Sequence, residues 1–384
     1  MSAPLPGWEN QSGESTGIPG VGIDEPDAPL IDVDLPDASL LASRARRLSP
    51  AQYAHAVHDL FDGRVPPGTI DVINVALGAS GYSTDPDANP PNQAVVEQLY
   101  FAAEEVALQS VDHIAELLNC DVLDSEACVD RFVDRLVLRA YRRPLFDEEL
   151  QHVRARFTEA RQEGFSPEEA FAVLVQETLL SAPFLYVTEI GDRSLDDGRI
   201  ELSHYEIATR LGLAYADSIP DEALLQAAAD GRLKDPEELA THAERLLETY
   251  PERVPARFVG EWLHLDSTLQ KDLPDFDADL AASMREEWER LLARAVRSDA
   301  SLGESLLNPQ TIPLNARLAE FYGVEGFEPG ADGWNWMAMP DHLTGLFSRP
   351  YALASWAGVR DSSPVERGVI VLTQLLCAPI GSPP

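Results

Sequence analysis

Two histidines three residues apart are the first side chains in this sequence that could act together on a ligand. His55 and His58 lie in "LSPAQYAHAVHDLFD", and at this spacing on a helix both imidazoles would lie on one face. Imidazole binds zinc, but a zinc site needs further ligands, and none follows at a recognisable spacing. The sequence therefore favours surface or capping histidines and predicts no metal site. The remaining histidines are scattered along the chain: His113, His152, His204, His242, His264 and His342.

An acidic motif imitates the start of a calcium-binding loop. Asp85, Asp87 and Asn89 in "DPDAN" have the alternating oxygen ligands with which an EF-hand loop begins. That loop needs glycine at its sixth position and glutamate at its twelfth, where this sequence has Pro90 and Val96. We therefore interpret the motif as a polar turn. The sequence also lacks a nucleophile elbow and a phosphate-binding loop, and no catalytic pair can be chosen among its 65 acidic residues.

Two adjacent arginines in "YRRPL" offer a different chemistry, because a guanidinium group binds carboxylates and phosphates with two parallel hydrogen bonds. Arg142 and Arg143 end a predicted helix, and Pro144 forces the chain to leave it. One interpretation is that they cap the helix and pair with some of the many carboxylates of this chain. The other is that they form a clamp for an anionic ligand.

An aromatic residue and a histidine close another predicted helix in "EWLHL". Trp262 and His264 are interpreted first as residues that pack in the core. A binding role is the alternative, in which His264 would lie near His204 of "LSHYE" in the folded chain.

The net charge narrows the classes of partner. The chain has 384 residues, with 65 acidic against 29 basic side chains, and its formal net charge is −36. A field this negative argues against nucleic acid and anionic membrane surfaces as partners. No run of 18 apolar residues predicts a membrane span, and the first residues, "MSAPLPGWENQSGESTG", lack the pattern of a signal peptide.

Three cysteines allow one disulfide and one remaining thiol. Cys120 and Cys128 flank the acidic stretch "DVLDSEA", which is short enough to connect the end of one helix to the start of the next. We predict that these two cysteines form a disulfide, which would stabilise the fold by about 2 kcal/mol. The alternative is two unrelated thiols. Cys377 has no plausible partner among the other two.

The elements that would position these residues are mostly helices. One start signal recurs: a capping Ser or Asp, then Pro at the first helical position, then Glu or Gln at the third. It opens helices at Ser49, Ser166, Asp235 and Ser363, and "SHYE" at Ser203 has the same pattern without Pro. Helical periodicity marks further segments: 93–119, 126–140, 147–163, 220–230, 253–264, 276–297, 313–322 and 340–354.

The predicted fold class is therefore mostly α, with two or three packed helical subdomains and few short strands. The best strand signal is "FLYVTEI" at 184–190. Loop-like stretches near 63–92, 190–200 and 323–339 are natural breaks. We expect an extended acidic arm at 1–42, an N-terminal helical domain at 43–190, a central one at 191–325, and a C-terminal module with a Pro-rich exit at 326–384.

The last helix is predicted to be buried. Val365, Val369, Leu372 and Leu376 are four, three and four residues apart, which places them on one face of an α-helix that ends before Pro379. If a further module follows, the apolar surface near Leu376 would pack against it.

Several segments resemble one family in order along the chain. "LSPAQYAHAVHDLFD", "FVDRLVLRAYRRPLFDEEL", "TLLSAPFLYVTEIG" with "LSHYEIATRLGLAYADSIPDEALLQAAADGRL", "IPLNARLAEFYGV" and "SSPVERGVIVLTQLLCAPIGSPP" look like the modules of the planctomycete-type family of exported proteins, which is also common in myxobacteria. That family is built from consecutive domains of unknown function. The resemblance runs from about residue 46 to the end, and it includes Arg367 in the motif "SPVERG".

The resemblance implies an exported protein, located in the periplasm, at the cell surface or outside the cell. It also implies a C-terminal module with a C-x-x-C-H haem-attachment motif after the Pro-rich exit. This sequence contains no such motif, so we expect no cofactor in this chain, haem c in a missing downstream module, and that module or a partner chain as the C-terminal partner. The resemblance implies no known reaction.

Three functions therefore stay open. The first is an exported scaffold or binding module of a haem-associated cell-surface protein. The second is a hydrolase that acts on extracellular polysaccharide, which would need a cleft with two close carboxylates, one of them with a raised pKa. The third is a structural surface or assembly subunit. The candidate binding residues are Arg142, Arg143, His204, Trp262, His264 and Arg367.

Overall fold

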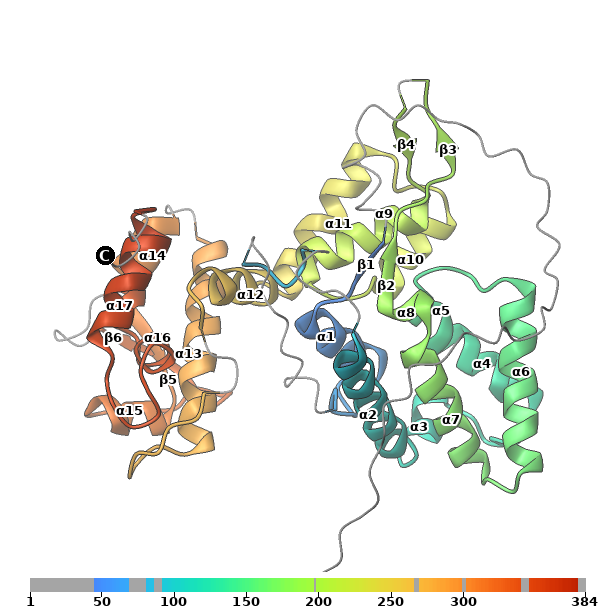
Figure 1. Cartoon of the computed structure of the whole chain (residues 1–384), viewed down its shortest axis with the longest axis horizontal. Helices are drawn as coiled ribbons and strands as arrows, with labels where there is room; N and C mark the ends of the chain where they lie inside the picture. The colour runs from blue at the N-terminus through green and yellow to red at the C-terminus, as the bar shows by residue number, and fades with distance from the viewer. Residues whose placement is uncertain are drawn as a thin grey trace, which may run out of the picture. The chain divides into compact units, whose positions relative to one another are not determined.

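The computed structural model describes residues 45–68, 81–85, 92–196, 198–265, 269–298, 302–339 and 345–378. Within them the chain is mostly helical, as predicted, and its strands are short and paired two by two (Figure 1). The predicted arm at 1–42, Asp87 and Asn89 of the polar turn, His342 and Pro379 lie outside the described residues.

The first hydrophobic cluster is built by the N-terminal elements. Its centre is the packing of α2 against α7, and the rings of Phe132, Phe157 and Phe171 meet inside it. The elements are β1 (Ala45–Arg47), α1 (Pro50–Leu60), α2 (Gln93–Ser110), α3 (Ile114–Leu118), α4 (Glu126–Phe132), the π-helix η4 (Val133–Val137), α5 (Leu138–Tyr141), α6 (Asp147–Gln162), α7 (Pro167–Leu180), α8 (Ala182–Leu185) and β2 (Tyr186–Thr188).

A second, smaller cluster follows, with Leu224 and Leu246 buried at its centre. Its elements are β3 (Arg193–Ser194), β4 (Ile200–Glu201), α9 (His204–Leu211), the π-helix η5 (Gly212–Ala216), α10 (Glu222–Ala229) and α11 (Pro236–Thr249).

The third cluster surrounds the long helix α13, whose Trp288 is fully buried and meets the ring of Tyr351. This cluster joins residues on both sides of the domain boundary expected at 325. Its elements are α12 (Arg253–Trp262), α13 (Ala278–Val296), α14 (Leu302–Leu307), β5 (Thr311–Leu314), α15 (Ala316–Tyr322), β6 (Asn335–Ala338), the 3₁₀-helix η6 (Leu346–Ser348), α16 (Pro350–Ser355), α17 (Pro364–Ile370) and the π-helix η7 (Val371–Leu375).

The recurring start signal acts as the sequence predicts. Ser49, Ser166 and Ser203 each accept a hydrogen bond from the backbone N–H three residues on, and the Gln or Glu side chain at that position accepts one from the cap. Asp235 caps α11 and Ser363 caps α17 through their side chains alone. The strand expected at 184–190 is shorter, because α8 continues to Leu185 before β2 pairs antiparallel with β1.

The expected burial of the last helix is wrong. Val365, Leu372 and Leu376 are 79%, 44% and 65% exposed, whereas Ile370 is buried and Leu375 packs against the third cluster. For Leu372 and Leu376 the physical reason is η7, where each carbonyl accepts from the fifth residue on rather than the fourth. Its wider turn shifts the angular position of these two residues, so a spacing counted for an α-helix selects the wrong face. Val365 lies before η7, in the first turn of α17, and faces solvent there.

Cys120 and Cys128 form a disulfide, with their Cα atoms 6.0 Å apart. It connects Cys120, two residues after the end of α3, to Cys128 in α4, as the spacing predicted. Cys377 is a free and exposed cysteine.

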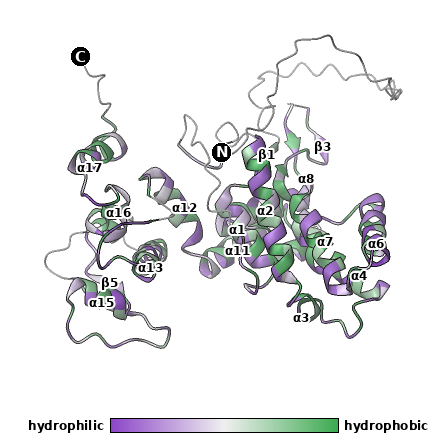
Figure 2. Ribbon diagram, turned by 60° about the horizontal axis from the view of Figure 1, so that its bottom comes forward, coloured by the Kyte–Doolittle hydropathy of each residue, from purple (hydrophilic) through white to green (hydrophobic). Residues whose placement is uncertain are grey.

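Hydrophobic and hydrophilic residues alternate along the helices in Figure 2. In the part of the chain that the structure describes, no helix combines the length and the apolar character that crossing a membrane requires.

Candidate functional site

A groove lies along one face of α13, with a volume of about 1110 Å³. The end of α11, the turn at Pro251 and Glu252, and the segment Leu269–Lys271 form its other walls. The groove is open because the lining positions on this face of α13 include small residues, whereas the opposite face buries Trp288 and its neighbours in the third cluster. The alanines that line it are Ala278, Ala281, Ala282 and Ala293.

Basic and acidic side chains are equally numerous around this groove. This balance is unusual for a chain with 65 acidic and 29 basic residues. The basic residues are Lys271, Arg285, Arg290 and Arg297, and the acidic residues are Glu252, Asp277, Glu286 and Glu289.

Several of these charges are held by neighbours. Arg290 donates to Glu286 on the same helix at 2.9 Å and pairs with Asp332 at 2.9 Å, while its guanidinium lies over the ring of Trp334. Lys271 donates to the carbonyl of Ala357 at 2.8 Å. These contacts hold the side chains of Arg290 and Lys271 in defined positions along the wall of the groove.

Glu289 is a carboxyl group of the groove whose pKa is raised. Burial raises its pKa, the nearby carboxylates of Glu252 and Glu286 raise it further, and Arg285 and His55 oppose the shift. A carboxyl group of this kind holds its proton at a higher pH than an exposed glutamate and can donate it to a ligand.

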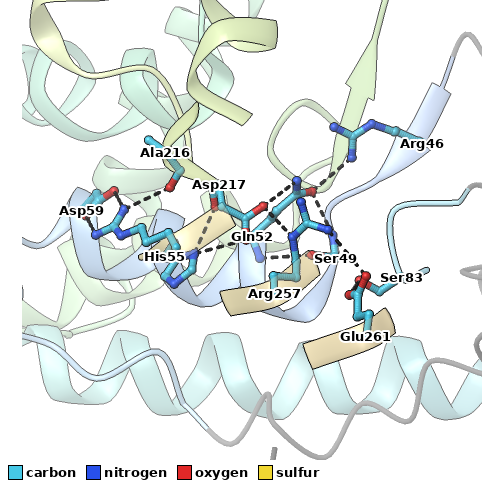
Figure 3. A network of polar contacts seen from close by, with 11 residues as sticks. Arg46, Ser49, Gln52, His55, Asp59, Ser83, Ala216, Asp217, Arg257 and Glu261 are labelled. Carbon is cyan, nitrogen blue, oxygen red and sulfur yellow. Dashed lines mark hydrogen bonds and ion pairs between the residues drawn. The ribbon is translucent and has the colours of Figure 1, made fainter. Parts of the chain in front are cut away.

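A polar network lies beside His55 and has Asp217 at its centre (Figure 3). The side chain of Asp217 is fully buried, and its Oδ1 accepts hydrogen bonds from Gln52 at 3.1 Å and from Arg257 at 2.8 Å. Its Oδ2 lies 3.5 Å from Nδ1 of His55, and its backbone carbonyl lies 3.1 Å from the same nitrogen. The network therefore joins α1, α12 and the turn after η5.

Local backbone geometry places Asp217 at this point. It follows the π-helix η5 with a left-handed φ of 50°, and its N–H donates to the carbonyl of Gly212. A Cβ atom at Gly212 would lie 2.9 Å from the carbonyl oxygen of Ser218, so only glycine lets the turn approach the helix this closely. Non-glycine residues in this conformation are strained, and such strain is often found at functional sites.

The same helix α1 makes a second, partly buried contact with α12. Asp59 pairs with Arg253 through two hydrogen bonds, of 2.7 and 2.9 Å. Burial alone would raise the pKa of Asp59, but the bonds from Arg253, Ser218 and His58 outweigh it and lower that pKa to about 2. Asp59 is therefore ionised throughout the neutral range, and it anchors α12, which leads to α13.

The structure places Arg142 and Arg143 in different roles. The guanidinium of Arg142 is buried and donates to four backbone carbonyls, those of Ala140, Phe184, Pro183 and Tyr186. It therefore holds α5 to α8 and β2. Arg143 is half-buried and pairs with Glu149 through two hydrogen bonds of 2.8 Å, and its guanidinium lies 4.3 Å from the ring centre of Phe146.

The other predicted site residues are not brought together. His264 is exposed at the end of α12, and His204 begins α9 in the second cluster. Trp262 donates to the carbonyl of Gln374 at 3.2 Å and stacks on Phe258.

The remaining residues that the sequence singled out are Arg367, His55 and His58. Arg367 is half-buried on α17, where its Nε reaches the carbonyl of Ser363 at 3.5 Å. His58 contacts Asp59, whereas His55 faces Asp217, so the two histidines have separate acidic partners. Among the described residues no group of three or more His, Cys, Asp or Glu side chains could hold a metal ion.

Sequence reasoning missed Asp217, Glu252 and Glu289. The chain has 65 acidic residues, and no spacing in the sequence distinguishes these three from the acidic residues at the surface. The one available signal was that α13 has alanines and glutamates on one face, which is also the pattern of an ordinary surface helix.

Two stretches of the chain match known families. Residues 128–189 match the family described as "PSD5: Protein of unknown function (DUF1595)". Residues 202–324 match the family described as "PSD4: Protein of unknown function (DUF1592)". No curated protein and no solved structure matches the chain.

The chain therefore contains two consecutive domains of unknown function, in agreement with the resemblance noted in the sequence. The first match includes Arg142 and Arg143. The second includes Asp217, α12 and all the residues that line the groove along α13.

Proposed function

We propose that the chain is a binding module of an exported, multidomain protein, and that the groove along α13 binds an extended polyhydroxylated ligand such as a polysaccharide. The observation that carries this proposal is a groove of about 1110 Å³ with four basic and four acidic side chains around it. Sugar hydroxyls both donate and accept hydrogen bonds, so guanidinium and carboxylate groups can each pair with them. The large negative net charge of the chain disfavours a polyanion as the ligand.

Export is supported by the disulfide, because such bonds persist in oxidising compartments. The acidic composition is also suited to the cell exterior.

Filling the groove tests the binding proposal. Ala282 lines the groove and is exposed, so Ala282→Trp should block the ligand without disturbing the core. We expect affinity for a soluble neutral polysaccharide to fall about tenfold or more, because a ligand would have to displace the indole. Isothermal titration against a panel of soluble glucans and xylans measures the effect.

The matched control is Ala240→Trp, which places the same side chain at an exposed position on α11 outside the groove. It should leave the affinity unchanged. Equal affinity in the wild type and in Ala282→Trp would show that the groove is not the binding site.

A second candidate function is hydrolysis of the bound polysaccharide. The observation that favours it is the raised pKa of Glu289 beside Glu252 and Glu286, since a glycosidase needs one protonated carboxyl group near a second carboxylate. Release of reducing ends separates the two functions. A hydrolase would lose turnover in Glu289→Gln and keep binding, whereas a binding module would show no turnover even as wild type.

We also propose that the module works beside a downstream haem-carrying module, as the resemblance implies. The support is the apolar surface on the last helix, where Val365, Leu372 and Leu376 are exposed. Backbone amides of α17 and η7 should exchange hydrogen more slowly in a chain that includes the downstream module than in residues 1–384 alone. Identical exchange in the two chains would exclude docking at this helix.

A further inference from the structure

The outward face of α2 carries large apolar side chains that are exposed to solvent. The inward face of this helix is buried in the first cluster, where α2 packs against α7. On the opposite side, Phe101 and Leu108 are 63% and 67% exposed, and Val96 and Tyr100 are exposed beside them. The rings of Tyr100 and Phe101 meet edge to face, with their centres 5.8 Å apart. These four side chains form the outer α2 surface.

A helix that is apolar on two opposite faces is typical of one that is covered on both sides. Single exposed apolar residues are common on proteins, whereas groups of them mark interaction sites. Here Val96 and Tyr100 are one turn apart, and Phe101 and Leu108 are two turns apart on the same face. The outer α2 surface therefore extends along about three turns of the helix, which is enough for a second helix to pack on it.

The charges around this surface are all negative. Glu97 and Glu104 lie on the same face of α2 as Phe101 and Leu108. Glu97 accepts a hydrogen bond from the neutral amide of Gln93 at 2.8 Å, and within the described residues neither Glu97 nor Glu104 forms an ion pair. The helices α2, α3 and α7 contain no Lys or Arg, and their acidic residues are Glu97, Glu104, Glu105, Glu116, Glu168, Glu169 and Glu177.

This charge decides between the possible occupants of the outer α2 surface. A second copy of the chain would bring the glutamates of two α2 helices together, and like charges across an interface are unfavourable. The acidic stretch at 1–42 has eight acidic residues and no Lys or Arg, so it would be repelled in the same way. An anionic membrane is disfavoured for the same reason. A basic partner would instead pair with carboxylates that have no cation of their own.

We propose that the outer α2 surface binds a basic amphipathic helix of a partner protein. The apolar stripe of that helix would pack on Phe101, Leu108 and Tyr100, and its flanking Lys or Arg residues would pair with Glu97 and Glu104. The proposal does not rest on the polysaccharide groove, because no residue of the outer α2 surface lines that groove.

A synthetic peptide of 18 residues made of Leu and Lys, with the leucines on one helical face, serves as the probe, and fluorescence anisotropy of the labelled peptide measures its affinity. We expect Phe101→Ser combined with Leu108→Ser to weaken binding about tenfold or more, because the apolar contacts at the centre of an interface dominate its affinity. We expect Glu97→Gln combined with Glu104→Gln to weaken it about threefold at low salt and to reduce its dependence on ionic strength.

The matched control removes two equally exposed apolar side chains elsewhere. Val122 and Ile190 are 62% and 68% exposed, so Val122→Ser combined with Ile190→Ser should leave the affinity unchanged. Two control peptides complete the design: one has the same residues in scrambled order, and one has Glu in place of Lys. Both should bind at least tenfold more weakly.

Four results would overturn the proposal. The first is no saturable binding of the amphipathic peptide, and the second is equal binding of either control peptide. The third is an equal loss of affinity in the variants at Phe101 and Leu108 and in those at Val122 and Ile190. The fourth is a different occupant: a dimer in sedimentation, or binding to phosphatidylcholine vesicles, that Phe101→Ser with Leu108→Ser abolishes.

Discussion

Arg142→Met is expected to lower the free energy of unfolding by about 4 kcal/mol, a large effect for one residue. The variant removes all the donors that the guanidinium supplies to the carbonyls of Ala140, Phe184, Pro183 and Tyr186. Buried carbonyls without partners are costly, and hydrogen bonds from charged donors are among the strongest in proteins.

The backbone at this position does not confound the comparison. Arg142 has a left-handed φ of 59°. Methionine has the same conformational cost as arginine in this region, because neither side chain is β-branched. The loss therefore reports on the guanidinium alone. Urea-induced unfolding followed by circular dichroism measures it.

The neighbouring residue supplies the control. Arg143→Met breaks a half-exposed pair with Glu149 and should cost about 1 kcal/mol or less. If the two variants lose the same free energy, the four carbonyl contacts of Arg142 contribute little to stability.

Arg349→Met is expected to destabilise the chain by about 3–5 kcal/mol, because it leaves a buried acid without its cation. Arg349 and Glu287 are each 1% exposed and lie 3.1 Å apart in the third cluster, and Tyr322 donates to the other oxygen of Glu287 at 2.7 Å. Removing both charges should restore much of the loss, because well-packed apolar side chains can replace a buried ion pair. We therefore expect Glu287→Leu combined with Arg349→Met to be more stable than Arg349→Met alone.

The pH dependence of stability gives a second measurement on the same pair. Burial raises the pKa of Glu287 to about 7, although Arg349 and Tyr322 oppose the shift. The folded chain therefore binds more protons here than the unfolded chain between about pH 4.5 and 7. The contribution of Glu287 to stability is present in full below this window and is lost as the pH rises through 7. Glu287→Gln should remove this part of the pH profile.

A surface arginine controls for the loss of charge in these experiments. Arg317 pairs with Asp277 at 3.1 Å on the exposed side of α15, and Arg317→Met should change stability by about 1 kcal/mol or less. A similar loss in Arg317→Met and Arg349→Met, or no recovery in the double variant, would contradict the account of a buried pair.

The helices were predictable because their signals are local. Ser49, Ser166 and Ser203 form capping boxes where the sequence places them, and a cap depends only on the next three residues. The disulfide between Cys120 and Cys128 was also predictable, since few residues separate its partners.

The candidate sites depend on contacts between distant residues, and these leave no local pattern. Gln52 and Asp217 are 165 residues apart, and Arg253 and Asp59 are 194 apart. Arg142 was identified from its sequence context, but its partners are backbone carbonyls, which every residue carries. A sequence shows that an arginine is present, and the fold alone determines which carbonyls surround it.

The π-helices η4, η5 and η7 have a consequence for how these domains tolerate change in length. A π-turn contains one more residue than an α-turn, so each is equivalent to a single-residue insertion absorbed inside a helix. Removing one residue from η5 would restore α-helical pairing there and rotate Asp217 away from Gln52 and Arg257. Homologous chains that differ by one residue within η5 should therefore have a different polar network between α1 and α12, even where every other helix aligns.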